Sequence, residues 1–123
     1  MAAHRYWRVH VTGITAFFGE GYWASVAEVE FRATVGGADQ ATGGTVLSSS
    51  ADGSYPASNA FDNSTSTFWV SALYSGLPQD IGYDFGSAVS VGEVAISTPS
   101  IPSLWDIAPR SFVVQSSDDG SAW

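Results

Sequence analysis

One oxygen-rich segment has the side chains that a divalent cation would need. Residues Ser58–Trp69 combine one carboxylate, from Asp62, with two amides and five hydroxyls. Ca²⁺ takes six to eight oxygen ligands from such groups and from backbone carbonyls. The alternative is a polar turn without metal, in which Asp and Ser side chains bond to the local backbone and Trp69 anchors the core. The residues alone leave both interpretations open.

Aromatic residues form a second group of candidates. They occur in the turn-rich stretches Phe17–Trp23, Ser71–Leu77 and Ser100–Pro109, and at Tyr55. Aromatic faces stack on the C–H faces of sugar rings, while neighbouring polar groups bond the hydroxyls. The candidate ligand-binding residues are Tyr22, Trp23, Tyr74, Trp105 and Asp106. Because Tyr and Trp are also enriched at protein interfaces, these residues favour a sugar site and an interface equally.

Catalysis has little support in the sequence. The two histidines, His4 and His10, lie in no nucleophile motif such as Gly-x-Ser-x-Gly. No phosphate-binding loop and no His-x-His zinc spacing occurs. A pair of carboxylates for glycoside hydrolysis is not excluded, since the sequence alone does not give the distance between two carboxylates. We therefore expect a protein that is not an enzyme.

The composition narrows the class of protein. The 123 residues carry 12 acids, four Arg and no Lys, which gives a formal net charge of −8. Nucleic acids and anionic membrane surfaces attract basic proteins, so neither is an expected partner. No cysteine is present, which excludes disulfides and thiolate metal sites. No apolar run approaches the roughly 20 residues that span a bilayer.

The elements that must position these candidates are strands. Alternating apolar and polar residues predict strands at 6–11, 27–32 and 80–85, and two further β-rich runs cover 91–97 and 111–116. Glu28 and Glu30 are expected to point away from the core. Short strands with frequent turns predict two antiparallel sheets that bury each other, as an all-β jelly-roll β-sandwich. We expect one domain over residues 1–123, with a Gly-rich loop at 36–44.

Several of these segments resemble one family, the coagulation factor 5/8 type C domains, which are discoidin-like and galactose-binding-like. Ser58–Trp69 resembles the family's Asp-Gly-x-x-x-Thr-x-Trp loop, with Asn63 in place of the usual glycine. The strands around Pro78–Gly86, Val91–Val94 and Pro109–Trp123 resemble those that follow it. Tyr6–Val11 and Ser25–Phe31 resemble the family's closing strands. The same fold group contains the family 32 carbohydrate-binding modules.

The order of the segments differs from the family's. The closing strands, in residues 1–35, precede the Gly-rich loop 36–44, and the remaining strands occupy 45–123. This order resembles a circular permutation found in discoidin-like domains of bacteriophage virion proteins. It implies a non-catalytic module on the virion surface, on head or tail, that adheres to glycans. The alternatives are a structural virion protein whose loops bind other subunits, and an extracellular carbohydrate-binding module of a secreted bacterial enzyme.

The resemblance also implies a structural Ca²⁺. Asp62, Ser64 and Thr67 would supply ligands from the loop, and Glu28, with Glu30 as a less favoured substitute, would supply a strand carboxylate. The family pattern continues into a further strand beyond the position of Trp123, so the sandwich is expected to lack a terminal strand. Either a longer polypeptide or a neighbouring subunit would supply it, which implies a larger assembly or a homo-oligomer.

Overall fold

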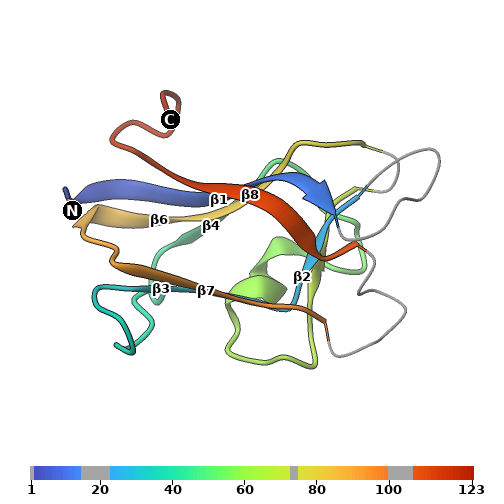
Figure 1. Cartoon of the computed structure of the whole chain (residues 1–123), viewed down its shortest axis with the longest axis horizontal. Helices are drawn as coiled ribbons and strands as arrows, with labels where there is room; N and C mark the ends of the chain where they lie inside the picture. The colour runs from blue at the N-terminus through green and yellow to red at the C-terminus, as the bar shows by residue number, and fades with distance from the viewer. Residues whose placement is uncertain (1, 15–22, 73–74, 100–106) are drawn as a thin grey trace.

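A computed structural model shows two packed layers of antiparallel strands (Figure 1). It describes residues 2–14, 23–72, 75–99 and 107–123. The elements are β1 His4–Ile14, β2 Ser25–Val26, β3 Glu28–Arg32, β4 Thr45–Ser48, the 3₁₀ turn η1 Ala57–Phe61, β5 Trp69–Val70, β6 Gln79–Val89, β7 Glu93–Ser97 and β8 Pro109–Ser117. The prediction of an all-β fold with antiparallel sheets is confirmed.

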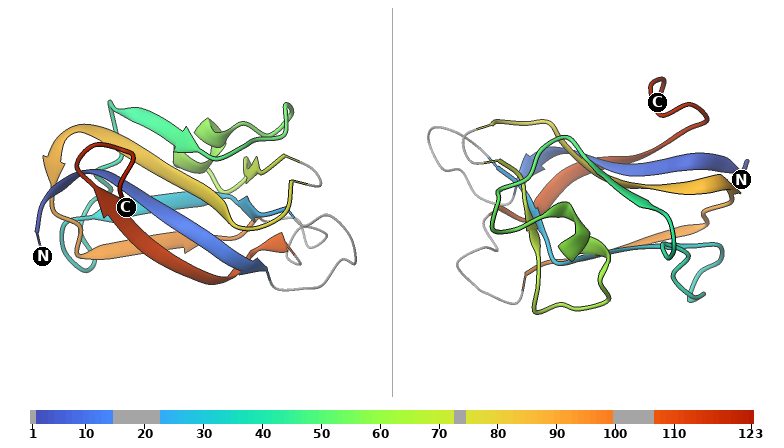
Figure 2. Two further views of the ribbon diagram at one scale, coloured as in Figure 1. Left: turned by 90° about the horizontal axis from the view of Figure 1, so that it is seen from above. Right: turned by 180° about the vertical axis from the view of Figure 1, so that it is seen from behind.

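The larger layer is a four-stranded sheet with the order β4-β6-β1-β8. β3 and β7 pair beneath it, and the short β2 and β5 form a third pair at one end. Figure 2 shows the two layers from above and from behind, with β3 and β7 lying across the four-stranded sheet. This arrangement agrees with a discoidin-like β-sandwich.

The core lies between the layers because the strands alternate. On β1, Trp7, Val9 and Val11 are at most 4% exposed, while Arg8 and His10 lie on the opposite, outer face. Val29 and Phe31 of β3 belong to the same buried cluster. The five predicted strand segments all fall on observed strands, at β1, β3, β6, β7 and β8.

The two faces of β8 are both exposed. β8 pairs with β1 along one edge, and its other edge is an edge of the four-stranded sheet. Phe112, Val113 and Val114 are 43%, 50% and 41% exposed. β1, in contrast, lies between β6 and β8, so the open edge is that of β8 and not that of residues 6–11.

Candidate functional site

The oxygen-rich segment forms a compact turn after η1. Oδ1 of Asp62 accepts the backbone N–H of Ser64 at 3.0 Å, and Oδ2 accepts the hydroxyl of Thr67. Asn63 lies between them with φ 59°, in the left-handed region. Asn tolerates this conformation better than most residues, which explains how it replaces a glycine here. The structure thus brings Asp62, Ser64 and Thr67 together in one turn.

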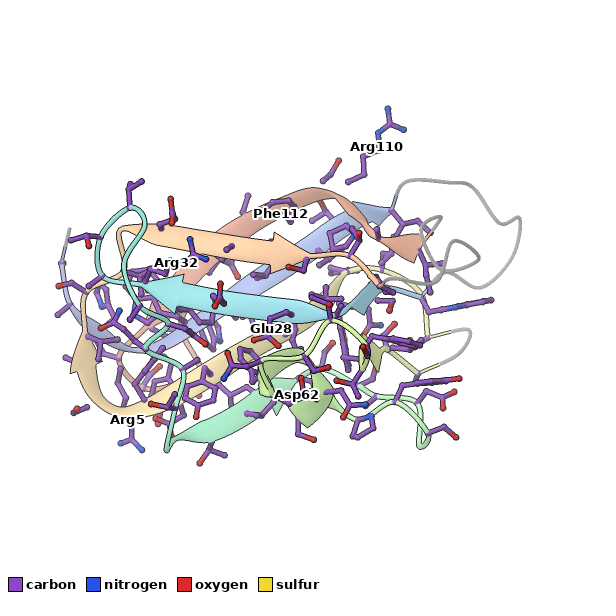
Figure 3. All side chains as sticks on the ribbon, turned by 90° about the horizontal axis from the view of Figure 1, so that it is seen from below. Arg5, Glu28, Arg32, Asp62, Arg110 and Phe112 are labelled. Carbon is purple, nitrogen blue, oxygen red and sulfur yellow. The ribbon has the colours of Figure 1, made fainter. Side chains whose placement is uncertain are left out.

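Glu28 reaches the same turn from β3. Its Oε1 accepts the backbone N–H of Asn63 at 3.0 Å, and its Oε2 is buried with no hydrogen-bond partner in the described part of the chain. The residue is only 6% exposed. Figure 3 shows Glu28 on β3 and Asp62 on the turn beside it. Glu28 thus points away from the core face, and the turn covers it, so its carboxylate is buried and not solvated.

Burial makes Glu28 a poor place for an uncompensated charge. Desolvation raises its pKa to about 7, and repulsion from Asp62, Asp39 and Glu30 acts in the same direction. The hydrogen bond from Asn63 opposes the rise without cancelling it. A cation beside Oε2 would supply the missing compensation.

Glu30, the less favoured substitute, is already bound. Arg32 donates to Glu30 Oε2 at 2.5 Å and to Glu93 Oε1 at 2.6 Å. The carboxylates at the turn are therefore those of Glu28 and Asp62. No cluster of three His, Asp or Glu side chains suited to a metal occurs among the described residues.

The aromatic candidates fall mostly outside the described residues. This holds for Tyr22, Tyr74, Trp105 and Asp106, whereas Trp23 is described and packs, partly buried, against the core cluster. Tyr55 is 40% exposed and stacks on Phe68, with ring centroids 4.9 Å apart. Tyr55 is thus packed against Phe68 and partly exposed to solvent.

The described residues that flank these aromatic segments meet at one end of the sandwich. Ile14 pairs with Pro109, which brings the segment after β1 and the segment before β8 to the same place. The backbone N–H of Ala24 donates to the Oγ of Ser71 at 2.8 Å, and the backbone N–H of Ser71 donates to the carbonyl of Ala24 at 2.8 Å. Figure 1 shows the described residues that flank 15–22, 73–74 and 100–106 at the same end of the sandwich, although they are far apart in sequence.

The outer face of the four-stranded sheet carries a polar cluster that the sequence did not indicate. Asp80 lies 2.6 Å from His10 Nδ1 and 3.4 Å from Arg8 Nε, and the guanidinium of Arg8 lies 4.2 Å from the ring centroid of Trp123. A shallow groove of about 230 Å³ adjoins the cluster. The alternation of β1 places Arg8 and His10 on this face. Asp80 lies beside them because β6 pairs with β1 in a register that sets Asp80 opposite His10.

A catalytic use of the histidines finds no further support in this geometry. His10 binds Asp80, and His4 binds Asp118 at 2.8 Å. Within the described ranges, no serine hydroxyl forms a hydrogen bond with either imidazole ring. The described residues thus contain no hydrogen-bonded serine–histidine pair.

Comparison with known proteins agrees with the fold and the turn. The family model of the F5/8 type C domain matches residues 45–123, which include the oxygen-rich turn and β4 to β8. No curated protein matches the chain. No helix in the described part of the chain has the length and apolar character needed to cross a membrane. F5/8 type C domains are generally non-catalytic modules that bind carbohydrates or other ligands, and this chain belongs to the F5/8 type C domain family.

Proposed function

We propose that this chain is a glycan-binding module whose ligand contacts the end of the sandwich where the three aromatic segments begin and end. One observation carries the proposal: Ile14 pairs with Pro109, and Ala24 is hydrogen-bonded to Ser71. These contacts bring the approaches to Tyr22, Trp23, Tyr74 and Trp105 to one place. These residue types supply aromatic faces that stack on a sugar ring, and Asp106 supplies a carboxylate that bonds sugar hydroxyls.

A glycan array tests this proposal. The intact chain should bind a limited set of glycans, and Tyr74→Ala and Trp105→Ala should each weaken binding by about tenfold or more. Trp123→Ala is the matched control, because Trp123 lies beside Arg8 and Tyr6 on another part of the surface. Equal binding by all three variants, each folded, would reject the site. An array without any bound glycan would reject the sugar as ligand.

We further propose that the module is part of a bacteriophage virion and lies on its surface. The order of the strands supports this, because β1 to β3 precede the region that matches the F5/8 type C domain. Mass spectrometry of purified particles should then detect the protein in many copies per particle, as expected of a structural component. Particles that carry the protein without any glycan binding would favour a purely structural role among virion subunits. Secretion with a bacterial enzyme, in the absence of particles, would favour an extracellular carbohydrate-binding module.

We also propose a structural Ca²⁺ at the oxygen-rich turn. Glu28 and Asp62 would supply carboxylate oxygens, and Ser64 and Thr67 carbonyl or hydroxyl oxygens. The buried Oε2 of Glu28, which has no partner among the described residues, supports this assignment. The ion would offset the repulsion between the two carboxylates and so hold β3 against the turn.

A further inference from the structure

The core-facing side of β8 is an exposed apolar surface among the described residues. Val9 and Val11 of β1 are fully buried, yet their register partners Val114 and Phe112 are 41% and 43% exposed. These four side chains share one face of the sheet. The second layer therefore covers β1 and leaves β8 uncovered.

An apolar groove of about 480 Å³ runs along this uncovered face. Trp7, Phe112 and Val114 line it from the four-stranded sheet, and Val91 and Val94 line it from the other layer. β7 is also open on this side: it pairs with β3 alone among the described strands, and all five of its residues are only partly buried. Both sheets thus end at the same side of the sandwich, with the groove between them.

Unpaired backbone borders the groove along β8. The strand spans Pro109–Ser117 and its edge away from β1 has no partner among the described strands. Free N–H and C=O groups on such an edge pair readily with another extended chain. A small apolar molecule would fill the groove but leave these groups unpaired, so the edge favours a polypeptide strand.

The charges around the groove define the chemistry of that strand. The two titratable groups that line it are already bound, Glu93 by Arg32 at 2.6 Å and His4 by Asp118 at 2.8 Å. The groove therefore accepts apolar side chains. Arg110, in contrast, projects from β8 near Phe112 and forms no ion pair with any described residue (Figure 3). A carboxylate opposite Arg110 would complete a cross-strand pair.

We propose that the groove between β7 and β8 binds an extended strand donated by a partner polypeptide. The strand pairs with the outer edge of β8, places alternate apolar side chains over Val94, Phe112 and Val114, and carries an acidic residue opposite Arg110. It completes the core of the sandwich. This surface is separate from the proposed glycan-binding end, so either proposal can fail while the other holds.

A synthetic peptide serves as the probe. It has about seven residues, with valine or isoleucine alternating with threonine and one glutamate at an end. Titration should slow amide hydrogen exchange along β8 and raise the melting temperature. A scrambled peptide without alternation, and a peptide N-methylated along one edge, should bind at least about tenfold more weakly. Equal binding by the N-methylated peptide would overturn strand pairing.

Neighbouring valines of β8 give a matched pair of variants. Val114→Lys places a charge in the groove and should abolish peptide binding. Val113→Lys lies on the opposite face, in register with His10, and should leave binding intact. Both side chains are about half exposed, so both variants should fold. Equal loss of binding in the two variants would contradict the proposal.

Covalent attachment of the peptide tests the proposal even where the free peptide binds weakly. Joining the same peptide to Trp123 through a flexible Gly/Ser linker raises its effective concentration to about the millimolar range. This fusion should melt at a higher temperature than a fusion to the scrambled peptide, and Val114→Lys should remove the difference. If neither the free nor the fused peptide stabilises the chain, the proposal is wrong. Light scattering that shows a dimer, dissociated by Val114→Lys but not Val113→Lys, would assign the groove to a second copy instead.

Discussion

The backbone N–H of Asn63 donates a 3.0 Å hydrogen bond to Glu28 Oε1, which joins the oxygen-rich turn to β3. The other oxygen of the same carboxylate, Oε2, is buried without a partner among the described residues. One side chain therefore both holds the turn and carries a poorly compensated charge. Its protonation state should control the stability of this part of the fold.

We expect the metal-free protein to lose stability as the pH rises. The pKa of Glu28 is raised from 4.5 to about 7 in the folded protein. Between these values the folded state binds the proton more strongly than the unfolded state, so the free energy of unfolding falls with rising pH. The full contribution of the protonated Glu28 to the free energy of unfolding is present below pH 4.5 and is lost above about pH 7. The loss amounts to at most about 3 kcal/mol.

Denaturant unfolding in EDTA across this pH range measures the effect. Glu28→Gln should flatten the dependence. Glu30→Gln should retain most of it, because Glu30 is partly exposed and paired with Arg32. A wild-type stability that rises between pH 5 and 7, after correction for the other carboxylates, would contradict the expected charge state of Glu28.

Calcium should stabilise the protein above pH 7. Binding to the folded state alone raises the melting temperature, and we expect an increase of about 3 °C or more at saturating Ca²⁺. Asp62→Asn should abolish the response. Asp52→Asn is the matched control, because Oδ1 of Asp52 accepts the N–H of Ser54 as Oδ1 of Asp62 accepts that of Ser64. A response that Asp62→Asn leaves unchanged would place any bound calcium elsewhere.

Trp69 should be the most sensitive aromatic position of the described core. Its side chain is fully buried, and its indole N–H donates to the carbonyl of Ser50 at 2.9 Å. Trp69→Phe removes both volume and this hydrogen bond and should cost about 2 kcal/mol of unfolding free energy. Trp123→Phe, at a partly exposed position, should cost less than about 0.5 kcal/mol. Urea unfolding compares the two, and equal effects would show that Trp69 does not anchor the core.

Gly82 should tolerate no side chain. A Cβ there would lie 2.5 Å from the carbonyl oxygen of Trp7 and 2.6 Å from Cβ of Arg8, because β6 and β1 are paired at this point. Gly82→Ala should destabilise the fold by about 2 kcal/mol, since backbone atoms cannot move aside. Gly53→Ala meets no atom within 4 Å and should change stability by less than about 0.5 kcal/mol. Equal melting temperatures for the two variants would contradict this pairing.

The sequence by itself determined five of the eight described strands, the inward face of β1 and the chemistry of the turn. Alternation identified Trp7, Val9 and Val11 as core residues, because a strand directs successive side chains to opposite faces whatever it packs against. The resemblance to the factor 5/8 type C loop selected Asp62, Ser64 and Thr67, whose contacts with one another are local. Asn63 could be assigned a left-handed backbone for the same local reason.

Only the tertiary structure decided which surfaces are covered. Glu28 has the alternation of an exposed strand acid, yet the turn 35 residues later buries it. Phe112 and Val114 are apolar and share a sheet face with the buried Val11 and Val9, yet they are exposed because no described element lies over β8. Alternation reports the direction in which a side chain points. Burial also depends on which distant segment packs there, and that is settled by long-range contacts between strands, which no local pattern encodes.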